Sequence, residues 1–148
     1  MGLRTWETQD ALYSQGRQSL SVVNNKRVAA GLGAISAAEN LHTITRAPAG
    51  KSYHNFGCAI DLVEDGDPYK AGIQWSWAST KNYYKIGQEA KKFPEITWGG
   101  TFRSIIDLPH IEIHGNVSLA SMNLLYKSGG IQKVWDAVDE DLRIQRLL

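Results

Sequence analysis

Ser52-Tyr53-His54-Asn55-Phe56-Gly57-Cys58-Ala59-Ile60-Asp61 places a histidine and a carboxylate in one short stretch of the chain. His54 and Asp61 lie an odd number of positions apart, so a straight strand would point their side chains to opposite faces. The two side chains converge only if the backbone turns between them, and Gly57 can adopt the angles that such a turn requires. The stretch therefore predicts a turn at Gly57, followed by a strand that carries Asp61.

The alternation of side chains after Gly57 is typical of a strand over residues 58–63, because strand side chains point to the two faces in turn. We expect Ile60 and Leu62 to face the core, with Asp61 projecting from the other face. Cys58 lies in the same apolar alternation and is the single cysteine of the chain, which excludes an intrachain disulfide and a cysteine-based zinc knuckle. We expect it to be a buried cysteine and not a nucleophile.

A second stretch, Asp107-Leu108-Pro109-His110-Ile111-Glu112-Ile113-His114, supplies further acidic and imidazole groups. In a strand, His110, Glu112 and His114 share one face. Pro109 is tolerated at the start of a strand and holds the preceding residue extended, so Asp107 lies within roughly 10 Å of His110. We expect a strand that begins near His110.

The two stretches together supply the groups that a hydrolytic zinc site requires. Such a site takes three ligands from His, Asp or Glu and keeps a fourth position for water, whose pKa falls toward ~7. The spacing allows His110 to bind the metal while Asp107 acts as general base on that water. We interpret the two stretches as one zinc peptidase site.

Simpler interpretations exist for each residue. A lone histidine and acid at this spacing are more often a surface histidine and an unrelated carboxylate, and Glu112 on its own fits a solvated strand face. His42 belongs to no motif and is expected at the surface. His114 is not expected to be a ligand, because His110 already fills the third position. Residue types alone leave a metal site and its absence about equally open.

Composition places the chain among ordinary globular proteins. Its 148 residues fit a single domain over residues 1–148, with 43% hydrophobic and 21% charged residues. A net charge of +1 argues against nucleic-acid binding through a strong positive field. No apolar run reaches the ~18 residues of a membrane span, and the first residues do not resemble a signal peptide. We expect a monomer.

Helices are expected at both ends of the chain, with short strands between them. The fold class is therefore α+β, with a small, mostly antiparallel sheet flanked by helices. Residues 64–68 are expected to form a turn or loop. Periodicity and capping residues predict helices over residues 5–16, 20–30, 36–41, 79–93, 118–128 and 131–142, and strands at 96–98 and 111–113.

The two stretches together resemble the sequence motifs of a known family. The pattern Ser52-x-His54-x-x-Gly57-x-Ala59-x-Asp61 followed by Asp107-x-Pro109-His110-x-Glu112 is similar to that of the M15 zinc peptidases, which have a hedgehog/D-Ala-D-Ala-peptidase-like fold. Trp98-Gly99-Gly100 is a further landmark of the endolysin branch, which comprises the L-alanyl-D-glutamate endopeptidases of phages. The resemblance runs across nearly the whole chain.

The resemblance implies a role for each residue of the pattern. Zinc ligands would be His54, Asp61 and His110, and the catalytic base would be Asp107. Arg4 matches the substrate-binding arginine of the family, whose guanidinium stabilises the oxyanion of the tetrahedral intermediate. Ser52 would contact substrate, and Glu112 would orient a ligand or a substrate amine. Family members usually carry a helix and a strand before this arginine, so we expect either a start that is truncated relative to the family or a fold that has lost an edge strand.

The function expected from the resemblance is zinc-dependent hydrolysis of a peptide bond in the peptidoglycan stem, most specifically L-Ala-D-Glu. Cleavage at D-Ala-D-Ala, by a carboxypeptidase or dipeptidase, is the alternative within the enzyme class. A non-catalytic module that binds the cell wall is a third hypothesis. The expected place of action is the cell wall or periplasm, reached either as a phage or prophage lysin released from the cytoplasm or by means of a leader that this sequence lacks.

Overall fold

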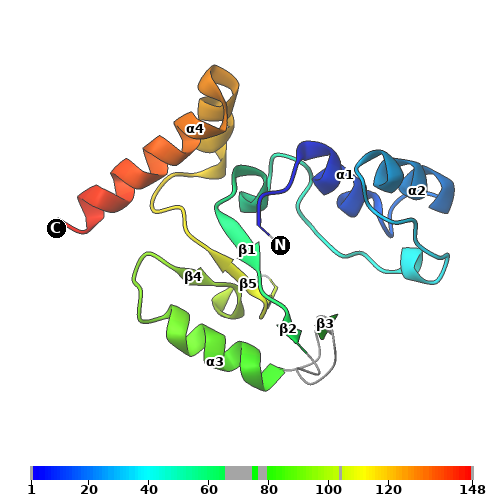
Figure 1. The fold of residues 1–148 in the computed structure, drawn as a ribbon, viewed down its shortest axis with the longest axis horizontal. Coiled ribbons are helices and arrows are strands. Elements are labelled where there is room, and N and C mark those ends of the chain that lie inside the picture. The colour runs from blue at the N-terminus through cyan, green and yellow to red at the C-terminus, as the bar shows by residue number, and fades with distance from the viewer. Residues whose placement is uncertain (1, 66–74, 77–79, 104, 148) are drawn as a thin grey trace.

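The computed structural model describes residues 2–65, 75–76, 80–103 and 105–147. A small sheet lies at the centre, and the helices lie around it (Figure 1). The helices are α1 (Trp6–Ser14), α2 (Leu20–Ala29), α3 (Thr80–Ala90) and α4 (Leu119–Gln145), with 3-10 turns η1 (Glu39–Leu41), η2 (Tyr53–Phe56) and η3 (Gly99–Thr101). The strands are β1 (Ala59–Asp61), β2 (Glu64–Asp65), β3 (Trp75–Ser76), β4 (Thr97–Trp98) and β5 (His110–Glu112).

The central sheet has the order β1-β5-β4, and both pairings are antiparallel. In the register of β1 and β5, Ala59 is opposite Glu112 and Asp61 is opposite His110. The two stretches that carry the candidate ligands are therefore neighbouring strands. This arrangement confirms the predicted α+β class with a small antiparallel sheet.

The N-terminal helices begin and end close to the predicted residues. Thr5 caps α1, since its Oγ1 accepts a hydrogen bond from the Thr8 amide at 3.1 Å. A reciprocal capping box precedes η1, in which the Ser36 amide donates to Glu39 Oε2 at 2.7 Å and the Glu39 amide donates to Ser36 Oγ at 3.2 Å. In Figure 1, α1 and α2 lie side by side, and the start of α1 contacts α4, where the Trp6 ring stacks on Tyr126.

Helix α4 has the break that the sequence predicts. Gly129 and Gly130 have non-helical backbone angles, and the φ of 73° at Gly130 lies in the left-handed region that glycine tolerates. Both halves of α4 contribute to the core that encloses η2 and the start of β1. The buried members of this core are Phe56, Cys58, Met122, Val134, Val138 and Leu142.

The orientation predicted for β1 is wrong. Ile60 is 42% exposed and Leu62 is half-buried, whereas Ala59 is buried. The buried face of β1 is the face of Ala59 and Asp61, because their partners on β5 are Glu112 and His110, which are also buried. The expected burial of Cys58 is confirmed.

The loop predicted at residues 64–68 is also partly wrong. Glu64 and Asp65 form β2, which pairs antiparallel with β3. The rest of that loop and the predicted helix cap Ser79 lie outside the described residues.

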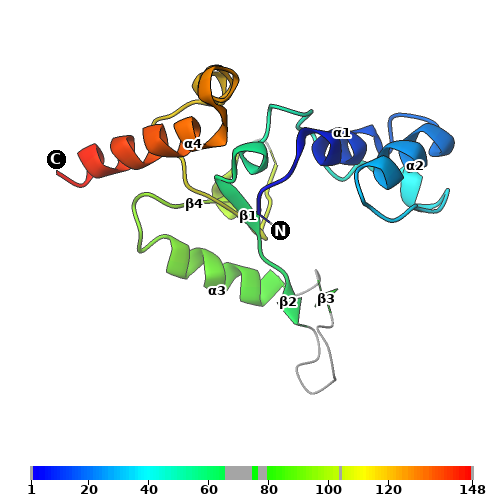
Figure 2. The same ribbon diagram turned by 45° about the horizontal axis from the view of Figure 1, so that its top comes forward.

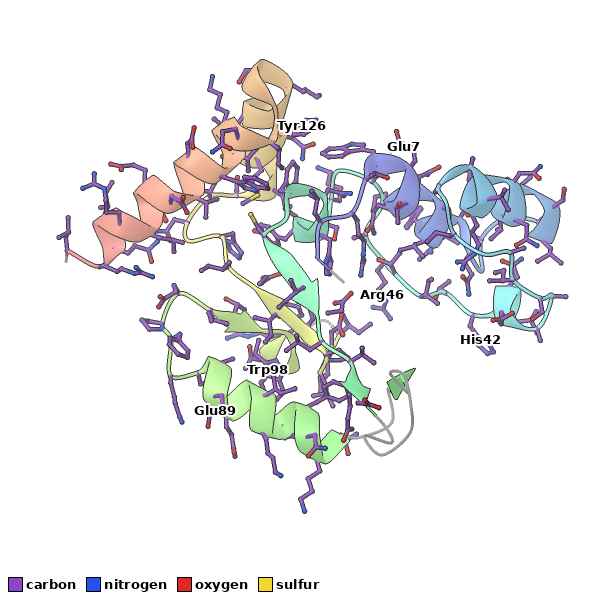
Figure 3. The ribbon with its side chains drawn as sticks, in the orientation of Figure 1. Glu7, His42, Arg46, Glu89, Trp98 and Tyr126 are labelled. Carbon is purple, nitrogen blue, oxygen red and sulfur yellow. The ribbon has the colours of Figure 1, made fainter. Side chains whose placement is uncertain are left out.

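Helix α3 lies beside β4, the edge strand of the sheet (Figure 2). A Cβ at Gly87 would overlap the Trp98 ring, so the indole lies directly on the helix backbone. In Figure 3, Trp98 lies between α3 and the sheet. Its Nε1 donates to the Leu108 carbonyl at 2.8 Å, which attaches the loop before β5 to β4. Among the helices of the described chain, we find none that combines the length and apolar character needed to cross a membrane.

Candidate metal centre

His54, Asp61 and His110 converge at one point, with a ligand atom of each within 4.8 Å of the others. His54 Nε2 is 3.2 Å and His110 Nδ1 is 3.3 Å from the same oxygen, Asp61 Oδ1. Gly57 makes this possible, because its φ of 69° turns the chain between η2 and β1 as predicted. Both histidines are buried, at 3% and 8% exposure.

The second nitrogen of each imidazole has its own partner. His54 Nδ1 is 3.2 Å from the Gly2 carbonyl, and His110 Nε2 is 2.9 Å from Glu112 Oε2. A carbonyl or carboxylate accepts hydrogen bonds, so these contacts place a proton on His54 Nδ1 and His110 Nε2. The nitrogens that face Asp61 are therefore the ones left to ligate a metal ion, and binding of the metal displaces any second proton from them.

The three side chains fit a zinc ion. In a tetrahedral site with bonds of about 2.0–2.1 Å, neighbouring ligand atoms lie about 3.3 Å apart. The separations from Asp61 Oδ1 to the two imidazole nitrogens match that edge. Two imidazoles and a carboxylate leave a fourth position for water, the donor set of a catalytic site.

Arg4 bonds to the same carboxylate from the other side, through Nη2 to Asp61 Oδ2. Its amide also donates to the His54 carbonyl at 2.8 Å, so the N-terminal segment runs along η2. Arg4 Nε is buried and has no hydrogen-bond partner among the described residues. Arg4 therefore contacts the cluster of His54, Asp61 and His110. That its guanidinium stabilises the oxyanion of the tetrahedral intermediate stays a prediction.

Asp107 lies in a tight turn at the edge of the cluster. Its amide donates to the Gly99 carbonyl at 3.0 Å, and its carbonyl accepts from the His110 amide at 3.1 Å. Burial raises the pKa of the Asp107 carboxyl, and the negative charge of Asp61 adds to the rise, while His110, His54 and Arg4 oppose it. A carboxylate with a raised pKa is suited to accept a proton near neutral pH.

The ligand carboxylate is held in its charged form. Burial alone raises the pKa of Asp61, but hydrogen bonds with His110 and His54 outweigh burial and hold that pKa well below its usual value. For Glu112, burial is again outweighed, by hydrogen bonds from His110 and His114, and the pKa falls to about 2. Both carboxylates are therefore hydrogen-bond acceptors at neutral pH.

Ser52, His42 and His114 lie outside the metal cluster. Ser52 is half-buried and immediately precedes η2, two positions before His54. His42 is exposed, as predicted, and lies away from the sheet, beside η1 (Figure 3). His114 is not in the metal cluster, but its Nε2 is 3.3 Å from Glu112 Oε1 and its ring stacks on Tyr53.

Sequence reasoning did not anticipate three of these contacts: Gly2 with His54, Arg4 with Asp61, and Tyr53 with His114. All three join residues more than fifty positions apart in sequence. The alternation of residues 110, 112 and 114 indicates the contact of His114 with Glu112, but it gives no signal for the stack of His114 on Tyr53.

Comparison with known proteins gives two findings. Residues 45–113 match a family model of the M15 peptidases, described as D-alanyl-D-alanine carboxypeptidase. The chain is also 28% identical over 124 residues to the peptidoglycan L-alanyl-D-glutamate endopeptidase CwlK of Bacillus subtilis (strain 168). That alignment covers 78% of this chain and 59% of the relative, so the chain spans little more than half of the relative's length.

The matched segment contains Ser52, Glu112, the cluster of His54, Asp61 and His110, and Asp107, whereas Arg4 precedes it. The segment around the candidate metal centre therefore belongs to the M15 peptidase family, and the chain is related to peptidoglycan L-alanyl-D-glutamate endopeptidases.

Proposed function

We propose that this chain is a zinc-dependent peptidase that hydrolyses the L-Ala-D-Glu bond in the stem peptide of peptidoglycan. The observation that carries the proposal is the cluster of His54, Asp61 and His110, in which both separations from Asp61 Oδ1 to an imidazole nitrogen match the edge of a tetrahedral zinc site. The choice of bond is supported by the similarity to the Bacillus subtilis endopeptidase. The place of action would be the cell wall, as for the endolysins of phages.

The metal would be held by His54 Nε2, His110 Nδ1 and Asp61 Oδ1. When bound, zinc supplies Lewis acidity, which lowers the pKa of a water molecule in the open position and polarises the substrate carbonyl. Glu112 holds His110 in the ligating tautomer, and the Gly2 carbonyl does the same for His54.

The remaining steps of the reaction are assigned to side chains near the metal site. Asp107 accepts the proton of the attacking water and returns it to the amine nitrogen as the peptide bond breaks. Arg4 places positive charge beside the carbonyl oxygen, where negative charge develops in the tetrahedral intermediate. Ser52, at the start of η2, is proposed to contact the substrate.

Space for a ligand adjoins Arg4. A cavity of about 620 Å³ lies between the N-terminal segment and the first half of α4, and its volume is in the range of small-molecule sites. Its lining includes Arg4, Trp6, Asn123 and Tyr126. We propose that part of the stem peptide enters here.

Digestion of purified cell walls tests the proposal. Zinc-loaded protein is expected to release peptides with new amino termini at D-Glu, while His54→Ala releases none. No new amino termini from the zinc-loaded protein would contradict peptidase activity, and zinc binding without hydrolysis would identify a non-catalytic wall-binding module.

A second candidate bond is D-Ala-D-Ala. The matching family model is described as D-alanyl-D-alanine carboxypeptidase, which favours this bond. The same digestion separates the two, since cleavage at D-Ala-D-Ala releases free D-alanine and leaves no new terminus at D-Glu.

A further inference from the structure

One carboxylate joins the ligand His110 to a histidine outside the metal cluster. His110 Nε2 is 2.9 Å from Glu112 Oε2, and His114 Nε2 is 3.3 Å from Glu112 Oε1. Glu112 therefore has one imidazole on each of its two oxygens. Its side chain is 11% exposed, so water provides little competition for these contacts.

Both imidazoles must donate to this carboxylate, because an ionised carboxylate has no proton to give. The proton on His110 Nε2 leaves Nδ1 free to face Asp61 and a metal ion. The proton on His114 Nε2 fixes the second oxygen of Glu112. Without that donor, the carboxylate could rotate away from the geometry that holds His110.

His114 is itself held by a stacked aromatic partner. Its ring lies 4.0 Å from the ring of Tyr53, with an interplanar angle of 3°. The second ring nitrogen, Nδ1, is buried and has no hydrogen-bond partner among the residues described. The ring is therefore placed by the Tyr53 stack and the Glu112 contact.

The stack also joins the two segments that carry the ligands. Tyr53 opens η2 and immediately precedes the ligand His54, while His114 follows β5, which begins at the ligand His110. Tyr53 and Ile113 both pack against the buried core, which gives this junction a fixed base. The Tyr53–His114 stack thus links η2 to the segment that follows β5, in addition to the contacts within the metal cluster.

We propose that His114 is a positioning residue for the metal centre, acting through Glu112 on the orientation and tautomer of His110. The inference rests on the proposed zinc site and goes beyond it, because His114 is neither a ligand nor a group that touches substrate. Outer partners of metal-bound histidines change metal affinity by about 10- to 100-fold when removed. His114 acts one contact further out, so we expect an effect near the lower end, about 10-fold.

A double-mutant cycle on zinc affinity tests this role. His114→Phe retains an aromatic ring for the Tyr53 stack and removes the donor, and it is measured in the native background and in Glu112→Gln. Zinc dissociation constants are obtained by competition with a chelator, and circular dichroism confirms folding. His42→Phe is the matched control, because it removes an exposed histidine away from the site.

His114→Phe is expected to weaken zinc binding about 10-fold in the native background and to have no further effect when Glu112 is already Gln. No weakening in the native background, or equal weakening in both, would overturn the inference. His114→Gln retains an N–H donor and is expected to bind zinc more tightly than His114→Phe, whereas equal or weaker binding would count against the donor role. If the unchanged protein binds no zinc, the proposed function fails along with the inference, whereas normal binding without coupling overturns the inference alone.

Discussion

At the scale of single residues, Asp107 and Glu112 have opposite electrostatic surroundings. Burial raises the pKa of Asp107, whereas hydrogen bonds from two histidines overcome burial and lower the pKa of Glu112 to about 2. Glu112 is also engaged by both imidazoles. Asp107 is therefore the better proton acceptor near neutral pH, and Glu112 is the better fixed acceptor of hydrogen bonds.

Asp107→Asn is expected to retain zinc and to lose activity by about 10²- to 10⁴-fold, because the amide cannot accept the proton of the attacking water. Zinc content and the rate of wall-peptide release are measured on the same preparation. Asp136→Asn, at an exposed position on α4, is the control for loss of a carboxylate. Full activity of Asp107→Asn would instead make Glu112 the candidate base.

The sequence pattern identified the residues of the cluster better than their contacts. His54, Asp61 and His110 meet as the M15 resemblance implied. The bond from Arg4 to Asp61 and the contact of His54 with Gly2 were not predicted, because they depend on how the N-terminal segment crosses η2. Single-sequence patterns report local periodicity and do not report such a crossing.

At the scale of elements, η3 supports the turn that carries Asp107. A Cβ at Gly99 would overlap the Asp107 carbonyl oxygen and lie 2.9 Å from His110 Cβ. The Gly99 carbonyl also accepts the Asp107 amide hydrogen bond at 3.0 Å. The close approach of η3 to this turn thus requires glycine.

Gly99→Ala is expected to destabilise the fold by about 1–3 kcal/mol, because the added methyl group must displace the turn. A displacement near 1 Å at Asp107 would lower activity by roughly 10²-fold. Gly33→Ala is the matched control, since a Cβ there meets nothing within 4 Å. Thermal unfolding and wall-peptide release are measured for both variants, and a Gly99→Ala protein that matches Gly33→Ala in both would contradict this description of η3.

Secondary structure was predictable where a local signal decides it. The Thr5 cap, the capping box before η1 and the glycine break in α4 are local signals, and the structure confirms them. The outward orientation of Ile60 was not predictable from alternation, because alternation defines two faces without indicating which one is buried. The pairing with β5 determines which face of β1 is buried, because His110 and Glu112 lie opposite Asp61 and Ala59.

At the scale of the whole molecule, Cys58 reports on the stability of the fold. Cys58 is 4% exposed and lies within the core shared by η2 and α4. Burial raises the pKa of Cys58 to about 11, so at pH 8 the folded protein holds it as an unreactive thiol. Modification of Cys58 therefore requires the core to open.

Labelling of Cys58 by a thiol reagent at pH 8 is expected to be slow in the folded protein and fast in denaturant. Zinc at 100 times its dissociation constant adds about 2.7 kcal/mol of stability and should slow labelling roughly 100-fold. The rate is measured with and without zinc, and His110→Ala should lose the zinc effect. Labelling of the folded protein at the rate of the unfolded chain would contradict this description of the core.

The central claim is that His54, Asp61 and His110 hold one zinc ion, and native mass spectrometry of zinc-loaded protein tests it most directly. The account predicts one zinc per chain for the unchanged protein and for His42→Ala, and none for His110→Ala. An unchanged protein without zinc, or a His110→Ala protein that retains one zinc with undiminished affinity, would contradict it.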